Sequence, residues 1–214
     1  MVGKVEFDDK FISPSPLPNA TVEAKECSKF FGTEPLLEDN ATKENVLKIM
    51  KDASIIHIAA HGHMNNADIF LSPNEGAPKP PSEEHYLLTA KDVTKCTLVA
   101  RLVVLSCCHS GRGEVSAEGV IGIARSFLGA GARSVLVTLW SIPDEATMIF
   151  MKEFYDKFVQ GLSVCVALQQ SMIELKKRKP MWAWARFQIV GEDIALSNDE
   201  IEEIRQLSSI RYKQ

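Results

Sequence analysis

The sequence has no surplus of positive charge and no long uncharged apolar run. Its 214 residues contain 24 Lys and Arg against 28 Asp and Glu, a formal net charge of −4. Nucleic-acid binding requires basic residues in excess on one face, so we expect no nucleic-acid partner. The most apolar segment, residues 120–140, includes Arg125 and Arg133, so we expect no membrane span. Charged residues also run through the first eleven positions, MVGKVEFDDKF, which excludes a secretory signal there.

The cysteines show no regular spacing. There are five of them, an odd number, and two are adjacent within an apolar run. This pattern excludes a disulfide framework and favours a reducing compartment, so we expect a cytoplasmic protein. The cysteines are Cys27, Cys96, Cys107, Cys108 and Cys165.

Several motifs of common enzyme classes are missing. The chain has no G-x-x-x-x-G-K-[ST] phosphate loop, no H-E-x-x-H, no paired C-x-x-C, and no G-x-S-x-G around Ser110. We therefore expect no metal and no cofactor. A zinc hydrolase stays a distant alternative, because enough zinc ligands occur near one another in the sequence: His57, His61, His63, Cys107, Cys108 and His109.

No internal repeat or low-complexity tract divides the chain, so residues 1–214 are expected to form one domain. Three prolines mark residues 1–20 as an extended lead-in, and residues 193–214 are expected to contain a peripheral helix. Short apolar runs alternate with helical patterns, which predicts an α/β fold with a mainly parallel sheet flanked by helices. The strands are expected over 54–60, 100–106, 133–139 and 187–190, and the main helices over 22–31, 117–128, 143–161 and 163–179, with further helical patterns after residue 40 and over 199–207.

Two of the expected strands end in residues that could carry chemistry. His61-Gly62 follows the first strand, and Cys107-Cys108 follows the second, so that Cys108 lies 47 positions after His61. Ligands of open parallel sheets bind at the carboxyl ends of the strands. A His-Gly strand followed by a Cys strand about fifty residues later is the order found in caspase-like cysteine proteases. A cysteine thiolate would attack the peptide carbonyl, a histidine would move the proton, and the N–H groups of Gly62 and the cysteine would hold the oxyanion.

Each of these residues also has a purely structural interpretation. A cysteine in an apolar strand is usually a small core residue, and a histidine at a strand end is often a hydrogen-bonded structural group. We interpret His57 as a core residue and assign no role to His85, which lies in a loop. His63 and His109 flank the expected site and therefore compete with His61 for the role of base.

Longer strings of the sequence resemble a known family. SIIHIAAHG and VVLSCCHSG are similar to the histidine and nucleophile strands of clan CD cysteine proteases. With NATKENVLKIM, EGVIGIARSFLGAGARSVLVTLWSIPDEAT and WARFQIVGE, they resemble the CHAT domain, a caspase-like domain commonly found after tetratricopeptide repeats. The resemblance covers roughly residues 15–192.

The resemblance implies a caspase-like three-layer sandwich and a cysteine endopeptidase that acts on protein or peptide substrates. It places the general base at His61 and the nucleophile at Cys108, with Cys107 as the preceding strand residue. CCHSG is also similar to metacaspases, but Ser106 stands where these have an acidic residue. LWSIPDEAT resembles the separase segment whose acidic residue receives the side chain before the scissile bond, so Trp140 and Asp144 are candidates for this S1 pocket. Ser106, at the position where metacaspases have their acidic residue, is a third candidate. Asp144 could equally be a first-turn helix residue.

No tetratricopeptide repeat is present in these 214 residues, so the resemblance implies an excised domain or a short standalone member. In longer relatives the repeats are thought to sense a partner and control the protease. The main alternative function is a catalytically silent CHAT domain that serves as a scaffold or protein-interaction module.

Overall fold

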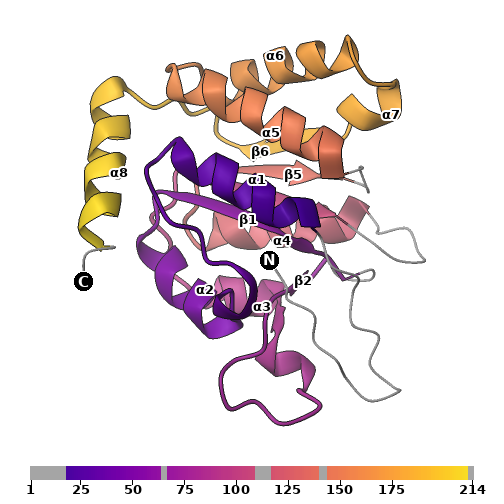
Figure 1. Cartoon of the computed structure of the whole chain (residues 1–214), viewed down its shortest axis with the longest axis vertical. Helices are drawn as coiled ribbons and strands as arrows, with labels where there is room; N and C mark the ends of the chain where they lie inside the picture. Colours follow the sequence, from indigo (N-terminus) through magenta and orange to yellow (C-terminus); the bar gives the residue numbers. More distant parts are fainter. Residues whose placement is uncertain (1–17, 64–66, 109–116, 140–143, 212–214) are drawn as a thin grey trace.

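The computed structural model describes residues 18–63, 67–108, 117–139 and 144–211 of the chain (Figure 1). Within these ranges a four-stranded sheet lies between layers of helices, and two short strands pair beside it. The strands are β1 (Ile55–His61), β2 (Ile69–Phe70), β3 (Leu87–Leu88), β4 (Leu102–Cys108), β5 (Ser134–Thr138) and β6 (Phe187–Gly191). The α-helices are α1 (Pro18–Lys29), α2 (Lys43–Ile49), α3 (Ala90–Thr94), α4 (Ala117–Gly129), α5 (Asp144–Val159), α6 (Val164–Lys176), α7 (Met181–Trp184) and α8 (Asn198–Arg211), and the short 3₁₀ helices are η1 (Glu38–Asn40), η2 (Met50–Asp52) and η3 (Glu83–His85).

The main sheet has the strand order β1-β4-β5-β6. β1, β4 and β5 run parallel to one another, and β6 pairs antiparallel with β5 at the edge. The expected α/β class with a mainly parallel sheet is therefore confirmed. All five side chains of β5 are buried, as the near-continuous apolar runs of the sequence predict for strands that are covered on both faces.

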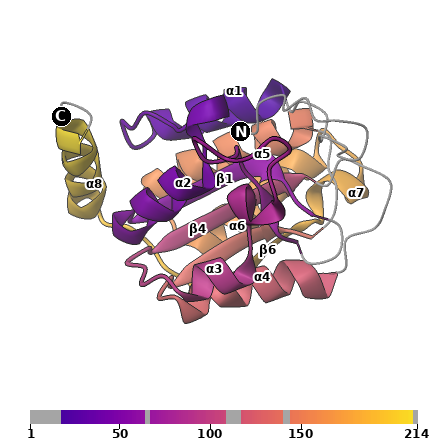
Figure 2. The same ribbon diagram turned by 90° about the horizontal axis from the view of Figure 1, so that it is seen from below.

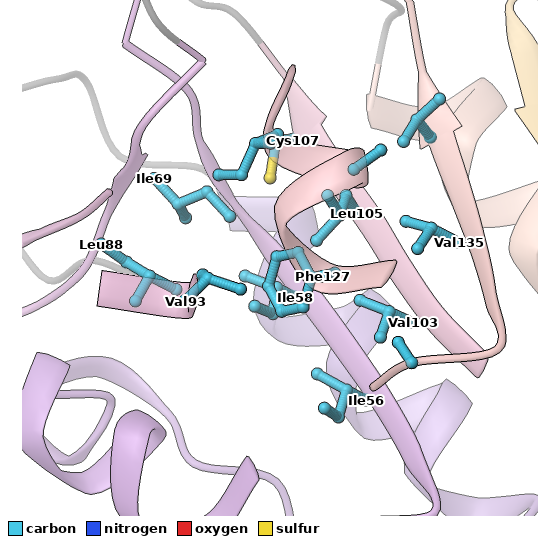
Figure 3. Close-up of a cluster of buried hydrophobic side chains, with 14 of the residues drawn as sticks. Ile56, Ile58, Ile69, Leu88, Val93, Val103, Leu105, Cys107, Phe127 and Val135 are labelled. Atoms are coloured by element: carbon cyan, nitrogen blue, oxygen red, sulfur yellow. The ribbon is translucent and has the colours of Figure 1, made fainter. Parts of the chain in front are cut away.

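Helices cover the two faces of this sheet with separate apolar clusters (Figure 2). α3 and α4 cover one face, where Phe127 and Val93 pack near Ile58, Val103 and Leu105 (Figure 3). α1, α5 and α6 cover the other face with a cluster rich in phenylalanine. Successive residues of each strand contribute to opposite clusters, because side chains alternate along a strand.

Local signals in the sequence explain where several helices begin and end. The Ser163 hydroxyl accepts a hydrogen bond from the Val166 N–H at the start of α6, as expected for an N-cap. Thr89 and Asp92 form a capping box at α3. After α4, Gly131 adopts a φ of +117°, and a Cβ there would lie 2.4 Å from the Leu98 carbonyl oxygen. This position therefore requires glycine.

Some boundaries differ from the sequence predictions. The helix expected over 22–31 spans Pro18–Lys29, because proline is well tolerated in the first turn of a helix. The extended lead-in expected over 1–20 therefore includes the start of α1, and its residues 1–17 lie outside the described ranges. The strand expected over 100–106 spans Leu102–Cys108, so Cys108 is its last residue and does not begin the following turn. The two-residue strands and α7 were too short to show a periodic pattern.

The C-terminal helix α8 packs at the side of the sheet and its covering helices (Figure 1). Ile201 is buried, and Arg205 Nε donates a hydrogen bond of 3.1 Å to the Phe30 carbonyl oxygen. Arg101 and Glu200 form an ion pair that connects α8 to the segment before β4. None of the helices in the described part of the chain has the length and apolar content that a membrane crossing requires.

Candidate active site

The register of β1 and β4 brings the two expected catalytic positions together. The strands are parallel neighbours, and the Cα of His61 pairs with the Cα of Cys108. Ala60 pairs with Cys107 in the same ladder. His61 and Cys108 are the last residues of their strands, so both lie at the carboxyl edge of the sheet, where ligands of open parallel sheets bind.

The segment after β1 is connected to the short β2–β3 pair. Gly62 is bridged to Ile69, and the His63 N–H donates to the Asp68 carbonyl oxygen at 2.6 Å. The His63 ring lies beside Phe70, with 5.8 Å between the ring centroids, and its Nδ1 is buried without a hydrogen-bond partner among the described residues. His61 itself is only 3% exposed. The β2–β3 pair thus fixes the backbone immediately after the candidate base.

Cys107 belongs to the apolar core. Its side chain is 8% exposed and packs in the cluster on the α4 face, near Ile69 and Leu105 (Figure 3). Val120 and Ile123 of α4 line the same small recess. This is the environment of a structural cysteine.

Of the three candidate S1 residues, Ser106 is the one whose side chain the structure describes. It is 3% exposed, and its hydroxyl has no hydrogen-bond partner within the described ranges. Thr138 of β5 is also 3% exposed, and its hydroxyl likewise has no hydrogen-bond partner within the described ranges. It follows Val137, which pairs with Leu105, the residue before Ser106. Trp140 lies outside the described residues, and Asp144 begins α5 with its side chain undescribed. His109 also lies outside the described residues.

His57 is buried, but its ring contacts polar groups. His57 Nδ1 lies 3.0 Å from Tyr155 Oη, and Nε2 lies 3.0 Å from Glu23 Oε1. Glu23 is 5% exposed and Tyr155 is 1% exposed. Burial raises the pKa of the Tyr155 hydroxyl well above its usual value, with smaller contributions from Cys27 and Glu23. This network holds α1 and α5 against β1, and both ring nitrogens are occupied away from Cys108.

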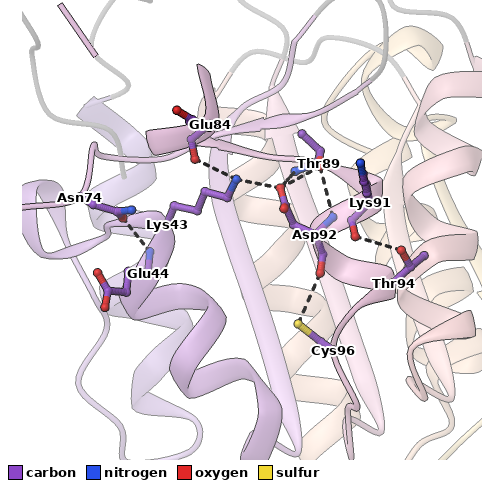
Figure 4. Close-up of polar contacts among 9 residues, drawn as sticks. All are labelled: Lys43, Glu44, Asn74, Glu84, Thr89, Lys91, Asp92, Thr94 and Cys96. Atoms are coloured by element: carbon purple, nitrogen blue, oxygen red, sulfur yellow. Dashed lines mark hydrogen bonds and ion pairs between the residues drawn. The ribbon is translucent and has the colours of Figure 1, made fainter. Parts of the chain in front are cut away.

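A second polar cluster supports the β2–β3 side of the site (Figure 4). Lys43 Nζ of α2 lies 2.8 Å from Asp92 Oδ2 of α3 and donates a hydrogen bond of 3.0 Å to the Glu84 carbonyl oxygen. Burial alone would raise the pKa of Asp92, but hydrogen bonds from Lys43 and Thr89 outweigh it and lower this pKa. No local pattern in the sequence marks either polar cluster, because each joins segments that are far apart in the chain.

One known protein family has a model that matches most of this chain. A family model described as the CHAT domain matches residues 2–192. The chain belongs to the CHAT domain family. This match confirms the family resemblance noted in the sequence.

Relatives of this CHAT domain are much longer proteins. It is 32% identical over 218 residues to tetratricopeptide repeat protein 28 of Mus musculus and of Homo sapiens. The alignments cover 86% of this chain but only 9% of either relative. A solved structure of the separase–securin complex from Saccharomyces cerevisiae matches with a TM-score of 0.47 and 22% identity, over 72% of this chain and 9% of that chain.

Within the described part of this CHAT domain, no group of three or more His, Cys, Asp or Glu side chains is placed to hold a metal ion. The side chains of Cys108 and His109, two of the six possible zinc ligands in the sequence, lie outside that description. The described part of the candidate site consists of His61, the Gly62 backbone and the backbone of Cys108.

Proposed function

We propose that this CHAT domain is a cysteine endopeptidase with a His61–Cys108 dyad. The pairing of His61 with Cys108 across adjacent parallel strands is the observation that carries the proposal. Neighbouring strands lie about 4.8 Å apart, which is close enough for two side chains on the same face to exchange a proton. Position 108 alternates with the α4-facing Cys107, so strand alternation assigns it to the face of His61.

The proposed reaction needs no group beyond these residues and water. His61 removes the proton from the Cys108 thiol, and the thiolate attacks the peptide carbonyl while the N–H groups of Gly62 and Cys108 hold the oxyanion. The C–N bond breaks as His61 protonates the leaving amine, which leaves a thioester on Cys108. Water, deprotonated by His61, then attacks the thioester and releases the acid and the thiol.

Selective alkylation tests the nucleophile. Brief treatment with iodoacetamide at neutral pH is expected to label Cys108 first, because the thiolate is the reactive form and His61 favours it. Burial strongly raises the pKa of the Cys27 thiol, and burial together with Asp193 raises the pKa of the exposed Cys165 thiol. Mass spectrometry of tryptic peptides after short labelling times gives the order of reaction.

Two variants complete this experiment. His61→Ala should slow the labelling of Cys108 and leave the labelling of Cys165 unchanged. Cys107→Ser should leave the labelling of Cys108 intact, since Cys107 is a buried core residue. Faster labelling of Cys107 than of Cys108 in the wild type would contradict the assignment.

One observation favours a second candidate function. The 3% exposure of His61 is low for a base that must meet a substrate, and it fits a silent CHAT domain that serves as a scaffold. A silent domain would show no preferential labelling of Cys108 and no effect of His61→Ala. In either case, repeats in a longer parent protein are proposed to control access to the site, in line with the names of the relatives.

We assign the S1 pocket to the face of β4 that carries Ser106. The buried Ser106 hydroxyl is a neutral group, so it cannot neutralise a basic side chain. Asp144, together with the Trp140 indole, is the proposed partner for Arg or Lys at the position before the scissile bond. Asp144 begins α5, directly after the segment that leaves β5, the neighbour of β4.

A carboxylate at this position has a measurable effect on specificity. Asp144→Asn is expected to lower kcat/KM for peptides with Arg or Lys before the scissile bond by about tenfold, the loss of one charge-assisted contact. Cleavage after Leu in a matched peptide should change far less. Equal losses for both peptides would show that Asp144 only stabilises the first turn of α5, and that an apolar residue is preferred instead.

A further inference from the structure

The corner between α6 and β6 carries an unusual surface outside the candidate active site. We define the α6–α7 patch as Lys176, Arg178, Met181, Trp182 and Arg186. Met181 is 69% exposed and Trp182 is 49% exposed. Ile173 of α6, one turn before Lys176, is 49% exposed. The described ranges contain eight exposed large apolar side chains, and three of them lie within residues 173–182.

Cations lie over the aromatic rings of this corner. Arg186 Cζ is 5.4 Å from the centroid of the Trp182 ring, and Lys176 Nζ is 5.4 Å from the centroid of the Trp184 ring. Such contacts combine the electrostatic attraction of a cation to an aromatic face with contact to an apolar ring. Burial lowers the pKa of Arg186.

The local charge is positive although the chain as a whole is negative. Lys177 pairs with Glu174 and Lys179 pairs with Glu145. Neither Lys176 nor Arg178 has an ion pair with any residue that the structure describes, and both are exposed. Basic residues commonly stabilise the end of a helix such as α6, but that role does not require the exposed Met181 and Trp182 on the next helix.

We propose that the α6–α7 patch binds an acidic segment of a partner protein, in which Asp or Glu residues alternate with apolar ones. The carboxylates would meet Lys176 and Arg178, and the apolar side chains would pack on Met181 and Trp182. Tryptophan and arginine are the residue types that contribute most to protein interfaces. The formal charge of −4 disfavours nucleic acid, which needs a larger basic surface.

The patch lies near the candidate active site without being part of it. α7 leads directly into β6, where the Leu139 N–H donates to the Arg186 carbonyl oxygen at 2.9 Å, just past the end of β5. β4 lies on the other side of β5, so a bound segment would occupy the same edge of the sheet as Cys108. Binding of such a segment does not require proteolysis, so the binding experiment tests this proposal independently of the proposed function.

Fluorescence anisotropy tests the proposal with a fluorescein-labelled peptide of alternating Glu and Leu and a peptide of alternating Gln and Leu. The 214-residue chain is expected to bind the Glu peptide at micromolar concentration, more weakly at higher salt, and to leave the Gln peptide unbound. Trp182→Ala and the double variant Lys176→Glu/Arg178→Glu should each weaken binding by roughly tenfold.

A double variant at the other end of β1 provides a control with the same change of net charge. Lys48→Glu/Lys51→Glu alters two exposed lysines of α2 and η2, and should bind the Glu peptide almost like the wild type. Equal weakening by both double variants, or binding that Trp182→Ala leaves intact, would overturn the assignment to this patch. Tighter binding to phosphatidylserine vesicles or a single-stranded oligonucleotide than to the Glu peptide would overturn the assignment of the ligand. Thermal unfolding confirms that each variant is folded.

Discussion

Replacing Cys108 or His61 by alanine is expected to lower kcat/KM for peptide hydrolysis by on the order of 10³-fold or more. The two residues pair in the β1–β4 ladder, and in the proposed dyad neither acts without its partner. The double variant should therefore be no slower than Cys108→Ala alone, since groups that act as a unit give losses that do not add. A peptide library first identifies the peptide that the wild type cleaves fastest. Initial rates of hydrolysis of that peptide then give kcat/KM for each variant.

The neighbouring residues provide the controls for this result. Cys107→Ser should retain most of the activity and mainly lower the free energy of unfolding, by about 1–3 kcal/mol, because it buries a hydroxyl among apolar side chains. His63→Ala and His109→Ala should both remain active. An inactive His63→Ala beside an active His61→Ala would reassign the base to the histidine near Phe70. His57 is unsuitable as a control, because its removal leaves Glu23 buried without that contact.

Replacing Lys43 by methionine is expected to lower the free energy of unfolding by about 3 kcal/mol at pH 7. The Lys43 side chain is 9% exposed, and its loss leaves the carboxylate of Asp92 partly buried beside an unpaired Glu84 carbonyl oxygen. Breaking one half of a buried pair costs more than the pair itself contributes, because the remaining charge keeps its desolvation penalty. Urea unfolding followed by circular dichroism measures the difference.

The effect of Lys43→Met should also depend on pH. The pKa of Asp92 is lowered in the folded state, so its contribution is present above the ordinary carboxyl pKa of about 4 and is lost as the pH falls through the lowered value. The difference from the wild type should therefore shrink in acid. Lys91→Met, at an exposed position of α3, should change the free energy of unfolding by less than about 0.5 kcal/mol. A constant difference from pH 7 to pH 3 would contradict the role given to Asp92.

The catalytic candidates could be predicted because local sequence carries the necessary information. Short apolar runs that end in His-Gly and in Cys-Cys indicate two buried strands, and they show which residues lie at the carboxyl ends of these strands. The resemblance to the CHAT family assigns Cys108 as the nucleophile, and strand alternation adds that Cys107 and Cys108 face opposite sides. The structure places Cys107 in the α4-facing core, as this rule predicts for one of the two. Which of them is the nucleophile stays a prediction for alkylation to test.

Other features depend on contacts between distant segments. Glu23 and Tyr155 meet at His57 from two helices on the same side of the sheet, and no periodic pattern marks them. The α6–α7 patch could not be predicted from the sequence for a different reason. In the sequence, the basic run at the end of α6 is typical of any helix C-terminus. The structure adds that the apolar side chains of Met181 and Trp182, in the next helix, are exposed to solvent.

The sequence by itself determined the fold class, the order of the strands along the chain and the two candidate catalytic residues. The fold class and the strand order follow from hydrophobic periodicity and from turn residues, which act over a few neighbouring residues. The two candidate residues follow from the chemistry of histidine and cysteine at the strand ends, together with the resemblance to the CHAT family. The tertiary structure decided that His61 lies opposite Cys108 and that Lys43 reaches Asp92. Strand register and buried ion pairs result from packing the whole chain around a common core, so their energies depend on partners that the local sequence does not specify.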